Sequence, residues 1–195
     1  MSSGIIEKAC HLIASGDLAG ASRVIATEYP FDPPQHAGRH YTPRIMTRIF
    51  MRDGFIDRYR GNRLVFPPVL RLLSHYLPAE LPYHRNWKMS EVHRAYWELF
   101  PTIDHVVPVA RGGADCEENW VSCSMRTNSI KSNWTLEDLN WELLPPGRLA
   151  NWDGLMTWFM QQAAADPAVL GNAYLRSWHA AARAARKDQP GDRSP

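Results

Sequence analysis

The spacing of apolar and polar residues predicts a chain made mostly of short helices. Apolar residues recur at intervals of three and four along most of the sequence, as they do on one face of a helix. The clearest start is Thr42-Pro43, a capping residue followed by proline at the first helical position. The predicted helices are two within residues 3–30, one from Thr42 to Gly54, those in PPVLRLLSHYL, MSEVHRAYWELF, MRTNSIKSNW and TLEDLNWELL, and two C-terminal ones in NWDGLMTWFMQQAAAD and NAYLRSWHAAARAARK.

A strand pattern replaces the helical one in the middle of the chain. The apolar run that begins at Phe100, FPTIDHVVPV, and the segment NWVSCS from Asn119 each predict a strand, and a helix follows the second. FIDRY and NRLVF, on either side of Arg60-Gly61, predict a small hairpin. The expected fold class is therefore α+β, a mainly helical protein with an embedded strand–loop–strand–helix core.

These elements suggest four consecutive parts. Residues 1–35 form an N-terminal helical segment, and residues 36–147 form the central domain, with its core at 101–134. Residues 148–187 are C-terminal helices packed on that core, and residues 188–195 are a flexible tail.

Composition indicates a packed protein of a reducing compartment. Of the 195 residues, 45% are hydrophobic and eight are tryptophan, which argues against disorder. The three cysteines form neither a CxxC pair nor an even disulfide framework, which suits the cytoplasm. We expect neither a signal peptide nor a membrane span, since no apolar run is long enough.

The central strand raises a chemical question, because it places Asp104 beside His105 within an apolar run. Burying an unpaired carboxylate costs several kcal/mol, on the order expected for an unsatisfied charged group. A strand–loop–strand–helix unit would bring this pair close to Asn119 at the second strand, and to Asn128 and Lys131 on the helix. One carboxylate and one amide oxygen suffice for Mg²⁺, which keeps several waters, and a neutral imidazole beside it can take a proton from an attacking water.

The motifs DHVVPVARGG, ENWV and NSIK resemble the HNH nucleases, whose ββα-metal site follows the pattern Asp-His, Pro, Gly-Gly, Asn, Asn, Lys. The intervals also match: fourteen residues from His105 to Asn119, nine to Asn128 and three to Lys131, as in the HNH domain of the RNA-guided CRISPR nucleases. The resemblance implies that His105 is the general base and that Asn119 holds the loop so that the imidazole meets the water. It also implies that Asp104 and Asn128 bind Mg²⁺ or Mn²⁺, and that Lys131 lies near phosphate or braces the helix.

One feature of many HNH members is missing. They carry two CxxC pairs that bind a structural zinc, but this chain has Asp57 and Arg60 at the first pair of positions and Ser124 and Thr127 at the second. Zinc needs thiolate or imidazole ligands, so we expect no structural zinc, with Asp57 and Arg60 paired in its place.

A DNA surface would have to come from local arginine, because the net charge is only +2. Residues 39–71 contain eight arginines and two acids, although a solvated charged face explains this as well. Arg44, Arg48 and Arg52 would share one helix face toward DNA, and Arg111 beside Gly112-Gly113 is a candidate phosphate contact.

The expected function is a divalent-metal-dependent endonuclease that hydrolyses DNA phosphodiester bonds, with bacterial restriction or phage defence as its setting by family analogy. Its expected partner is DNA, and dimerisation is left open. Two alternatives stay open: a non-catalytic nucleic-acid-binding module that retains the HNH fold, and a nuclease that acts on RNA.

Overall fold

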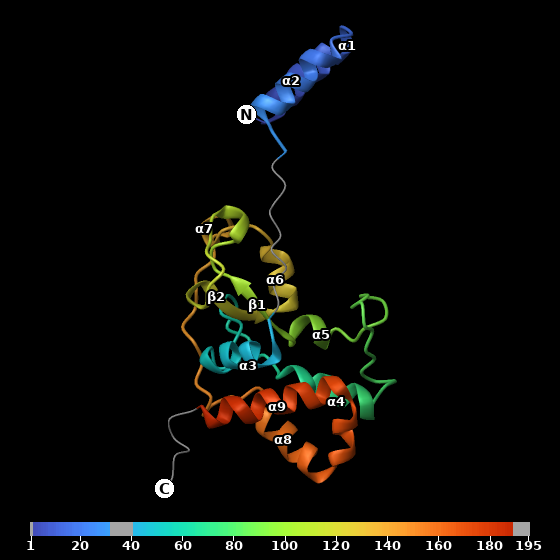
Figure 1. Ribbon diagram of the computed structural model, residues 1–195, viewed down its shortest axis with the longest axis vertical. Coiled ribbons are helices and arrows are strands. Elements are labelled where there is room, and N and C mark those ends of the chain that lie inside the picture. Colours follow the sequence, from blue (N-terminus) through green and yellow to red (C-terminus); the bar gives the residue numbers. More distant parts are fainter. Residues whose placement is uncertain (1, 32–40, 189–195) are drawn as a thin grey trace. The chain divides into compact units, whose positions relative to one another are not determined.

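The protein is mainly helical and carries one small antiparallel sheet. A computed structural model describes residues 2–31 and 41–188. The chain divides into two compact units, Met1–Arg39 and His40–Pro195. The C-terminal helices belong to the second unit together with the sheet, as Figure 1 shows.

The elements follow one another in the order helices, strand, strand, helices. The strands are β1 (Pro101–His105) and β2 (Trp120–Ser124), and the helices are α1 (Ser2–Ala14), α2 (Leu18–Glu28), α3 (Pro43–Arg52), α4 (Pro67–Tyr76), α5 (Ala95–Glu98), α6 (Met125–Lys131), α7 (Leu136–Leu139), α8 (Met156–Ala165) and α9 (Ala173–Lys187). Short 3₁₀ turns lie at Val109–Arg111, Glu117–Asn119 and Pro167–Gly171. Within the described ranges, every helix is too short or too polar to cross a membrane.

The first unit is a pair of helices, α1 and α2, as predicted. The Asp17 side chain caps α2 by accepting the N–H of Gly20. The buried residues of the pair are small: Ala9 on α1, and Gly20 and Ala21 on α2. The two helices therefore pack closely on small side chains.

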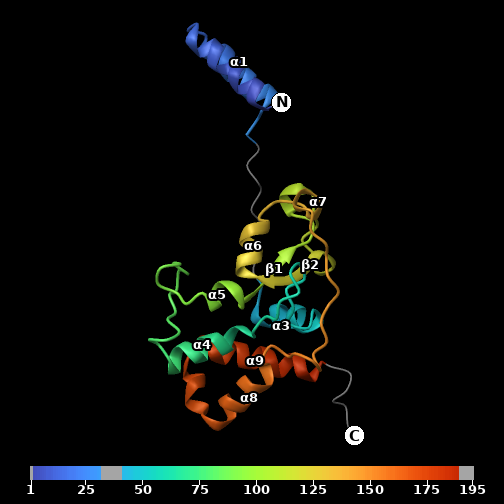
Figure 2. The ribbon, with the colours of Figure 1, turned by 180° about the vertical axis from the view of Figure 1, so that it is seen from behind.

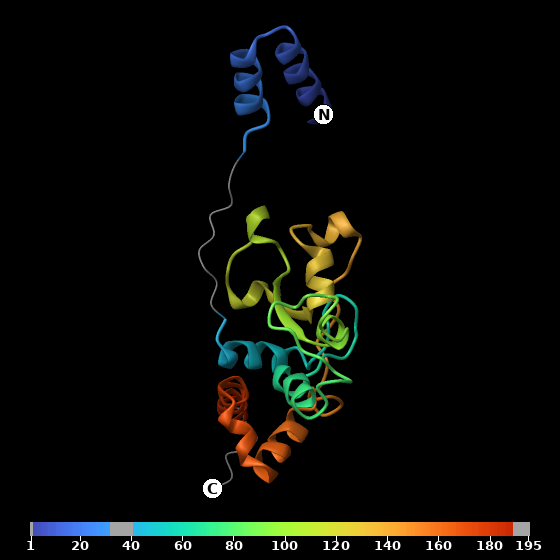
Figure 3. The same cartoon turned by 90° about the vertical axis from the view of Figure 1, so that its right-hand side faces the viewer.

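In the second unit, α3 lies between the sheet and the C-terminal helices (Figure 3). It begins where the sequence predicted, with the Thr42 hydroxyl accepting the N–H of Ile45 and Pro43 at the first helical position. Its Ile49 and Phe50 are fully buried. This helix carries the core contacts to α9 on one side and to both strands on the other.

Aromatic side chains fill the core below the sheet. The ring of Phe66 meets those of Phe55, Phe159 and Trp178 edge-on, with centroids 5.5–6.0 Å apart. Such pairs add about 0.5–1.5 kcal/mol each to the area that they bury. The helices α4, α8 and α9, seen from behind in Figure 2, are held together by these contacts.

The two strands pair antiparallel, with Pro101 opposite Ser124 and His105 opposite Trp120. Two fully buried carboxylates bind the outer edge of β2: Asp53 accepts the N–H of Ser122 at 2.7 Å, and Asp57 accepts the N–H of Ser124 at 3.0 Å. The edge is thereby closed by side chains and does not expose a row of unpaired donors.

Several predicted elements are shorter in the structure. The hairpin around Arg60-Gly61 is a single bridge between Ile56 and Arg63. The reason is Asp57, whose carboxylate accepts the N–H groups of the next turn and takes them out of strand pairing. Of the helix predicted in MSEVHRAYWELF, only α5 is helical in the structure, and of the helix predicted in TLEDLNWELL, only α7 is. The residue that follows α7, Asn140, has the left-handed conformation and ends that helix.

Candidate active site

Asp104 and His105 end strand β1, and their side chains enter different surroundings. Asp104 lies opposite Val121 on β2, and His105 lies opposite Trp120. Because consecutive residues of a strand face opposite sides of the sheet, one side chain meets α6 while the other meets the loop between the strands.

The Asp104 carboxylate is bound on the helix side by two buried donors. Its Oδ2 accepts the Tyr59 hydroxyl at 2.6 Å and the Lys131 ammonium at 2.9 Å. The Lys131 ammonium also donates to the His105 carbonyl at 2.7 Å, which ties the end of α6 to the end of β1.

This geometry corrects one of the two roles expected for Lys131. The residue is 0% exposed and its ammonium is held by Asp104 and the strand, so it does not reach a phosphate outside the protein. It braces α6 against the strand.

Burial and then the Asp104 carboxylate raise the pKa of the Tyr59 hydroxyl well above its ordinary value. Tyr59 therefore stays protonated and serves as a hydrogen-bond donor. Burial also raises the pKa of the Cys123 thiol, with the nearby carboxylate of Asp104 as the next cause. The thiol is an inert core group at neutral pH.

The His105 imidazole faces the loop, where Asp115 and Trp120 contact it. Its Nε2 lies 2.7 Å from Asp115 Oδ1, and the Trp120 indole N–H lies 3.0 Å from both atoms. Two acceptors without a proton between them repel at 2.7 Å, so with Asp115 ionised the proton lies on Nε2. The indole then donates to Asp115, and Nδ1 is the nitrogen that can accept a proton.

Asn119 spans the loop that separates the strands. Its amide oxygen accepts the N–H of Val107, and its amide nitrogen donates to the carbonyls of Val107 and Ala114 at 2.9 and 2.8 Å. Gly113 permits this closure, because a Cβ there would lie 1.9 Å from the Val107 carbonyl oxygen. The loop-holding contacts expected of Asn119 are present.

A metal at this site would draw on few protein ligands. The described residues contain no group of three or more His, Cys, Asp or Glu side chains that could hold a metal. Asp104 and the half-buried Asn128 on α6 remain, and the protein contacts of Asp104 within the described ranges fall on Oδ2. A carboxylate Oδ1 and an amide oxygen are hard ligands that fit Mg²⁺ with its retained waters.

The four positions that correspond to zinc ligands in many HNH nucleases lie together and are joined by hydrogen bonds. Asp57 accepts the N–H groups of Tyr59 and Arg60 on Oδ1 and that of Ser124 on Oδ2. The Ser124 hydroxyl donates to the Thr127 hydroxyl at 2.8 Å. We call this set, Asp57, Ser124 and Thr127 with the backbone they bind, the hydrogen-bonded clasp.

The prediction of an ion pair between Asp57 and Arg60 is wrong. Asp57 is 1% exposed and binds backbone N–H groups, whereas the Arg60 guanidinium lies over the Trp141 ring at 3.8 Å from its centroid. Backbone donors satisfy the carboxylate without the cost of burying a guanidinium.

The arginines expected to face DNA have acidic partners in the structure. Arg44 pairs with Asp188, Arg48 with Glu117, and Arg52 with Asp53. Arg111 lies 3.9 Å from Asp138 and 5.8 Å from the centroid of the Trp134 ring. Contact between these arginines and DNA stays a prediction, and it would compete with the pairs already formed.

Comparison with known families, curated proteins and solved structures gives no match. The case for a function therefore rests on the residues of the site.

Sequence reasoning missed three residues of this site. Tyr59 lies in the segment predicted as a hairpin, and no local signal connects it to Asp104, forty-five residues away. Asp115 stands in the acidic run after Gly112-Gly113, where several carboxylates are equally plausible partners for His105, and Trp120 lies in the predicted second strand. Only the loop geometry selects Asp115 among them.

Proposed function

We propose that the protein is a divalent-metal-dependent endonuclease that hydrolyses DNA phosphodiester bonds through an HNH-type ββα-metal centre. The observation that carries the proposal is the arrangement around the end of β1. Asp104 and His105 lie side by side, Asn119 closes the loop beside them, and α6 follows the second strand directly. This is the arrangement that the spaced motifs lead one to expect.

In the proposed reaction, His105 takes a proton from the attacking water on Nδ1. Asp115 holds the imidazole by its Nε2 proton, so the basic nitrogen keeps one orientation. Only 7% of the His105 side chain is exposed, which limits the water that reaches it. Asn119 fixes the loop, and Lys131 and Tyr59 fix the Asp104 carboxylate.

A bound Mg²⁺ or Mn²⁺ would supply positive charge for the phosphate and the leaving oxygen. Asp104 Oδ1 and the Asn128 amide oxygen are the atoms that would hold it.

One observation favours a second candidate, a nucleic-acid-binding module without turnover. The Lys131 ammonium already compensates the Asp104 carboxylate at 2.9 Å, so this buried charge needs no further cation for balance. The two candidates differ in one measurable property, cleavage in the presence of metal.

The test is cleavage of supercoiled plasmid, linear DNA and RNA in Mg²⁺, Mn²⁺ and EDTA by the parent protein and by His105→Ala. We expect metal-dependent cleavage of DNA and a loss of about a hundred- to ten-thousand-fold in His105→Ala, the usual range for a general base. Metal titration by calorimetry should be unchanged in His105→Ala and weakened in Asn128→Ala.

The matched control is Ser129→Ala, which alters the neighbouring position on α6 and should leave both properties unchanged. DNA binding without cleavage in any metal would favour the binding module. Turnover near that of the parent in His105→Ala would remove His105 from the reaction.

A further inference from the structure

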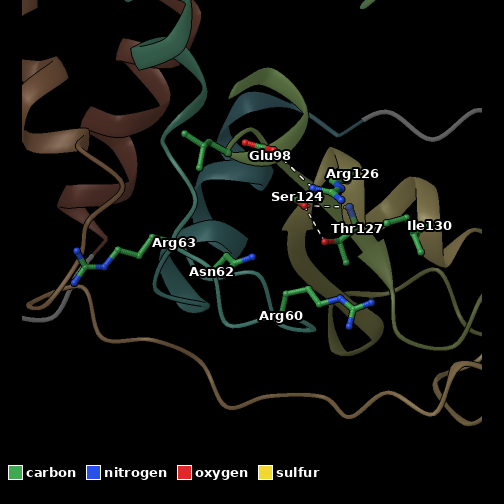
Figure 4. Close-up of a pocket in the computed structure, with 9 residues that line it drawn as sticks. Arg60, Asn62, Arg63, Glu98, Ser124, Arg126, Thr127 and Ile130 are labelled. Carbon is green, nitrogen blue, oxygen red and sulfur yellow. Dashed lines mark hydrogen bonds and ion pairs between the residues drawn. The ribbon is translucent and has the colours of Figure 1, made fainter. Parts of the chain in front are cut away.

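A second feature of the second unit is a groove of about 740 Å³ beside the hydrogen-bonded clasp. Three exposed arginines from two segments line it, Arg60 and Arg63 from the turn after Asp57 and Arg126 from α6 (Figure 4). One acidic residue, Glu98, shares the lining. The charges along the groove are thus mainly positive, although the protein as a whole is nearly neutral.

Aromatic rings hold two of these arginines in place. The Arg60 guanidinium lies 3.8 Å from the Trp141 ring centroid, and the Arg63 guanidinium lies 5.0 Å from that of Trp152. Stacking uses the flat face of a guanidinium and leaves its N–H edge available to an anion.

Ion pairing distinguishes these arginines from those of α3. Arg44, Arg48 and Arg52 each have a carboxylate partner. Among the described residues, no carboxylate pairs with Arg60 or Arg63. Arg126 has only a long contact of 3.7 Å with Glu98, and its side chain is 65% exposed. The groove therefore gathers three arginines that can still bind an external anion, unlike those of α3.

The arginines are spread along the groove and do not converge on one point. Figure 4 shows Arg60 and Arg126 near Ser124 and Thr127, whereas Arg63 lies apart with its guanidinium directed away from them. A single phosphate could not meet all three. A chain of phosphates, which B-DNA presents about every 3.4 Å along each strand, matches separated positive charges better.

We propose that this groove binds the phosphate backbone of nucleic acid, next to the reaction centre of the proposed nuclease. This proposal rests on the proposed function for the identity of the bound molecule as DNA. Ser124, which lines the groove, pairs with Pro101 four residues before His105. At about 3.3 Å per strand residue the groove begins roughly 13 Å along the strand from the backbone of His105, which corresponds to about four nucleotides along one strand.

The test is the salt dependence of duplex binding by the full chain carrying His105→Ala, which prevents cleavage during the measurement. The groove variant adds Arg60→Gln, Arg63→Gln and Arg126→Gln, and the matched control adds Arg23→Gln, Arg85→Gln and Arg183→Gln, which are also exposed. The slope of log affinity against log salt is negative, and we expect it to become shallower by about 0.9 for each phosphate that the protein no longer neutralises. This change should appear in the groove variant and not in the control.

Two further variants avoid the stacked arginines and keep the test valid if the triple variant is unstable. Arg126→Gln alone should lower the slope by about 0.9, and Glu98→Gln should tighten binding by removing the acid of the groove. Equal slopes in the parent, groove and Arg126→Gln proteins would overturn the proposal. Displacement of DNA by inorganic phosphate, at an ionic strength where KCl has no effect, would also overturn it, since it would indicate a site for one phosphate.

The outcomes separate this inference from the proposed function. If the parent protein cleaves nothing but its DNA binding depends on the groove arginines, the proposed nuclease activity is wrong and the proposal for the groove stands. Cleavage by the parent protein with equal binding by the groove variant would do the reverse.

Discussion

Asp104 and His105 are adjacent in the chain and similarly buried, but their side chains are bound by different parts of the protein. Asp104 is bound by a fully buried ammonium and a buried hydroxyl, so its partners come from the protein interior. The imidazole of His105 is bound by Asp115, whose side chain is 44% exposed, on a loop at the surface. Both side chains are buried, but one is bound by partners from the interior and the other by a carboxylate that is itself open to solvent.

The difference shows how a strand end can serve folding and chemistry at once. Because side chains alternate along a strand, the two residues lie on opposite faces of the sheet. Substitutions on the two faces should therefore affect different properties of the protein. Substitutions around Asp104 should alter stability most, and substitutions around His105 should alter turnover most.

The largest effect on stability is expected from Lys131→Met. The substitution keeps much of the side-chain volume but leaves the Asp104 carboxylate buried without its ammonium, which costs about 3–5 kcal/mol of unfolding free energy. Urea denaturation measures it. The matched control is Arg48→Met, which breaks the exposed pair with Glu117 and should cost about 0–1 kcal/mol. Equal losses in the two variants would mean that Lys131 is not a structural partner.

A second buried carboxylate extends the comparison to the hydrogen-bonded clasp. Asp57→Ala removes the acceptor for three backbone N–H groups and should cost about 2–3 kcal/mol of unfolding free energy, which urea denaturation measures.

Removal of metal tests the clasp in the parent protein. EDTA should stop cleavage and barely move the melting temperature of the parent protein. Elemental analysis that found one tightly bound zinc per chain, or unfolding on chelation, would contradict this account of the clasp.

On the His105 side, Asp115→Asn should lower kcat and leave the melting temperature nearly unchanged. The amide would offer a donor to Nε2 and favour the tautomer with the proton on Nδ1, where the base is needed. A loss on the order of ten- to a hundredfold is typical when a carboxylate that orients a functional imidazole is replaced. Steady-state kinetics with Glu117→Gln as control checks it. A drop in stability without a drop in kcat would place Asp115 with the structural group.

The smallest effect is expected from Tyr59→Phe, which removes one donor to Asp104 and should cost about 1 kcal/mol near neutral pH. Because burial raises the folded pKa of Tyr59, its contribution is fully present below the ordinary tyrosine pKa of about 10. Above that pH the unfolded chain releases a proton that the folded chain keeps, so this contribution declines as pH rises.

Unfolding free energies at about pH 8 and about pH 10.5, on either side of the ordinary tyrosine pKa, measure the change. The gap between the parent protein and Tyr59→Phe should narrow at the higher pH. A gap that widens would show that Tyr59 ionises more readily in the folded state.

Local signals predicted much of the fold. Thr42-Pro43 predicts the start of α3 because capping and a fixed proline φ act within a few residues. The helix after β2 follows equally from its local pattern. The hairpin failed because the Asp57 carboxylate competes for the same N–H groups, and strand propensity alone does not reveal such competition.

The site was predictable only as far as its spaced motif extends. His105, Asn119 and Lys131 lie around the end of β1 because the strand–loop–strand–helix order fixes where they can meet. Tyr59 and Asp115 were beyond reach, since their contacts depend on how distant segments fold back. The direction of Lys131 was also ambiguous, because a lysine can extend to solvent or turn inward to a carboxylate.

The hydrogen-bonded clasp bears on whether the proposed nuclease needs a metal ion in order to fold. A clasp made of a carboxylate, two hydroxyls and backbone N–H groups forms from the chain alone. We therefore predict that newly synthesised protein needs no ion to reach its folded state. A shortage of divalent cations would leave a stock of intact, idle protein that becomes active when the ion returns, without fresh synthesis.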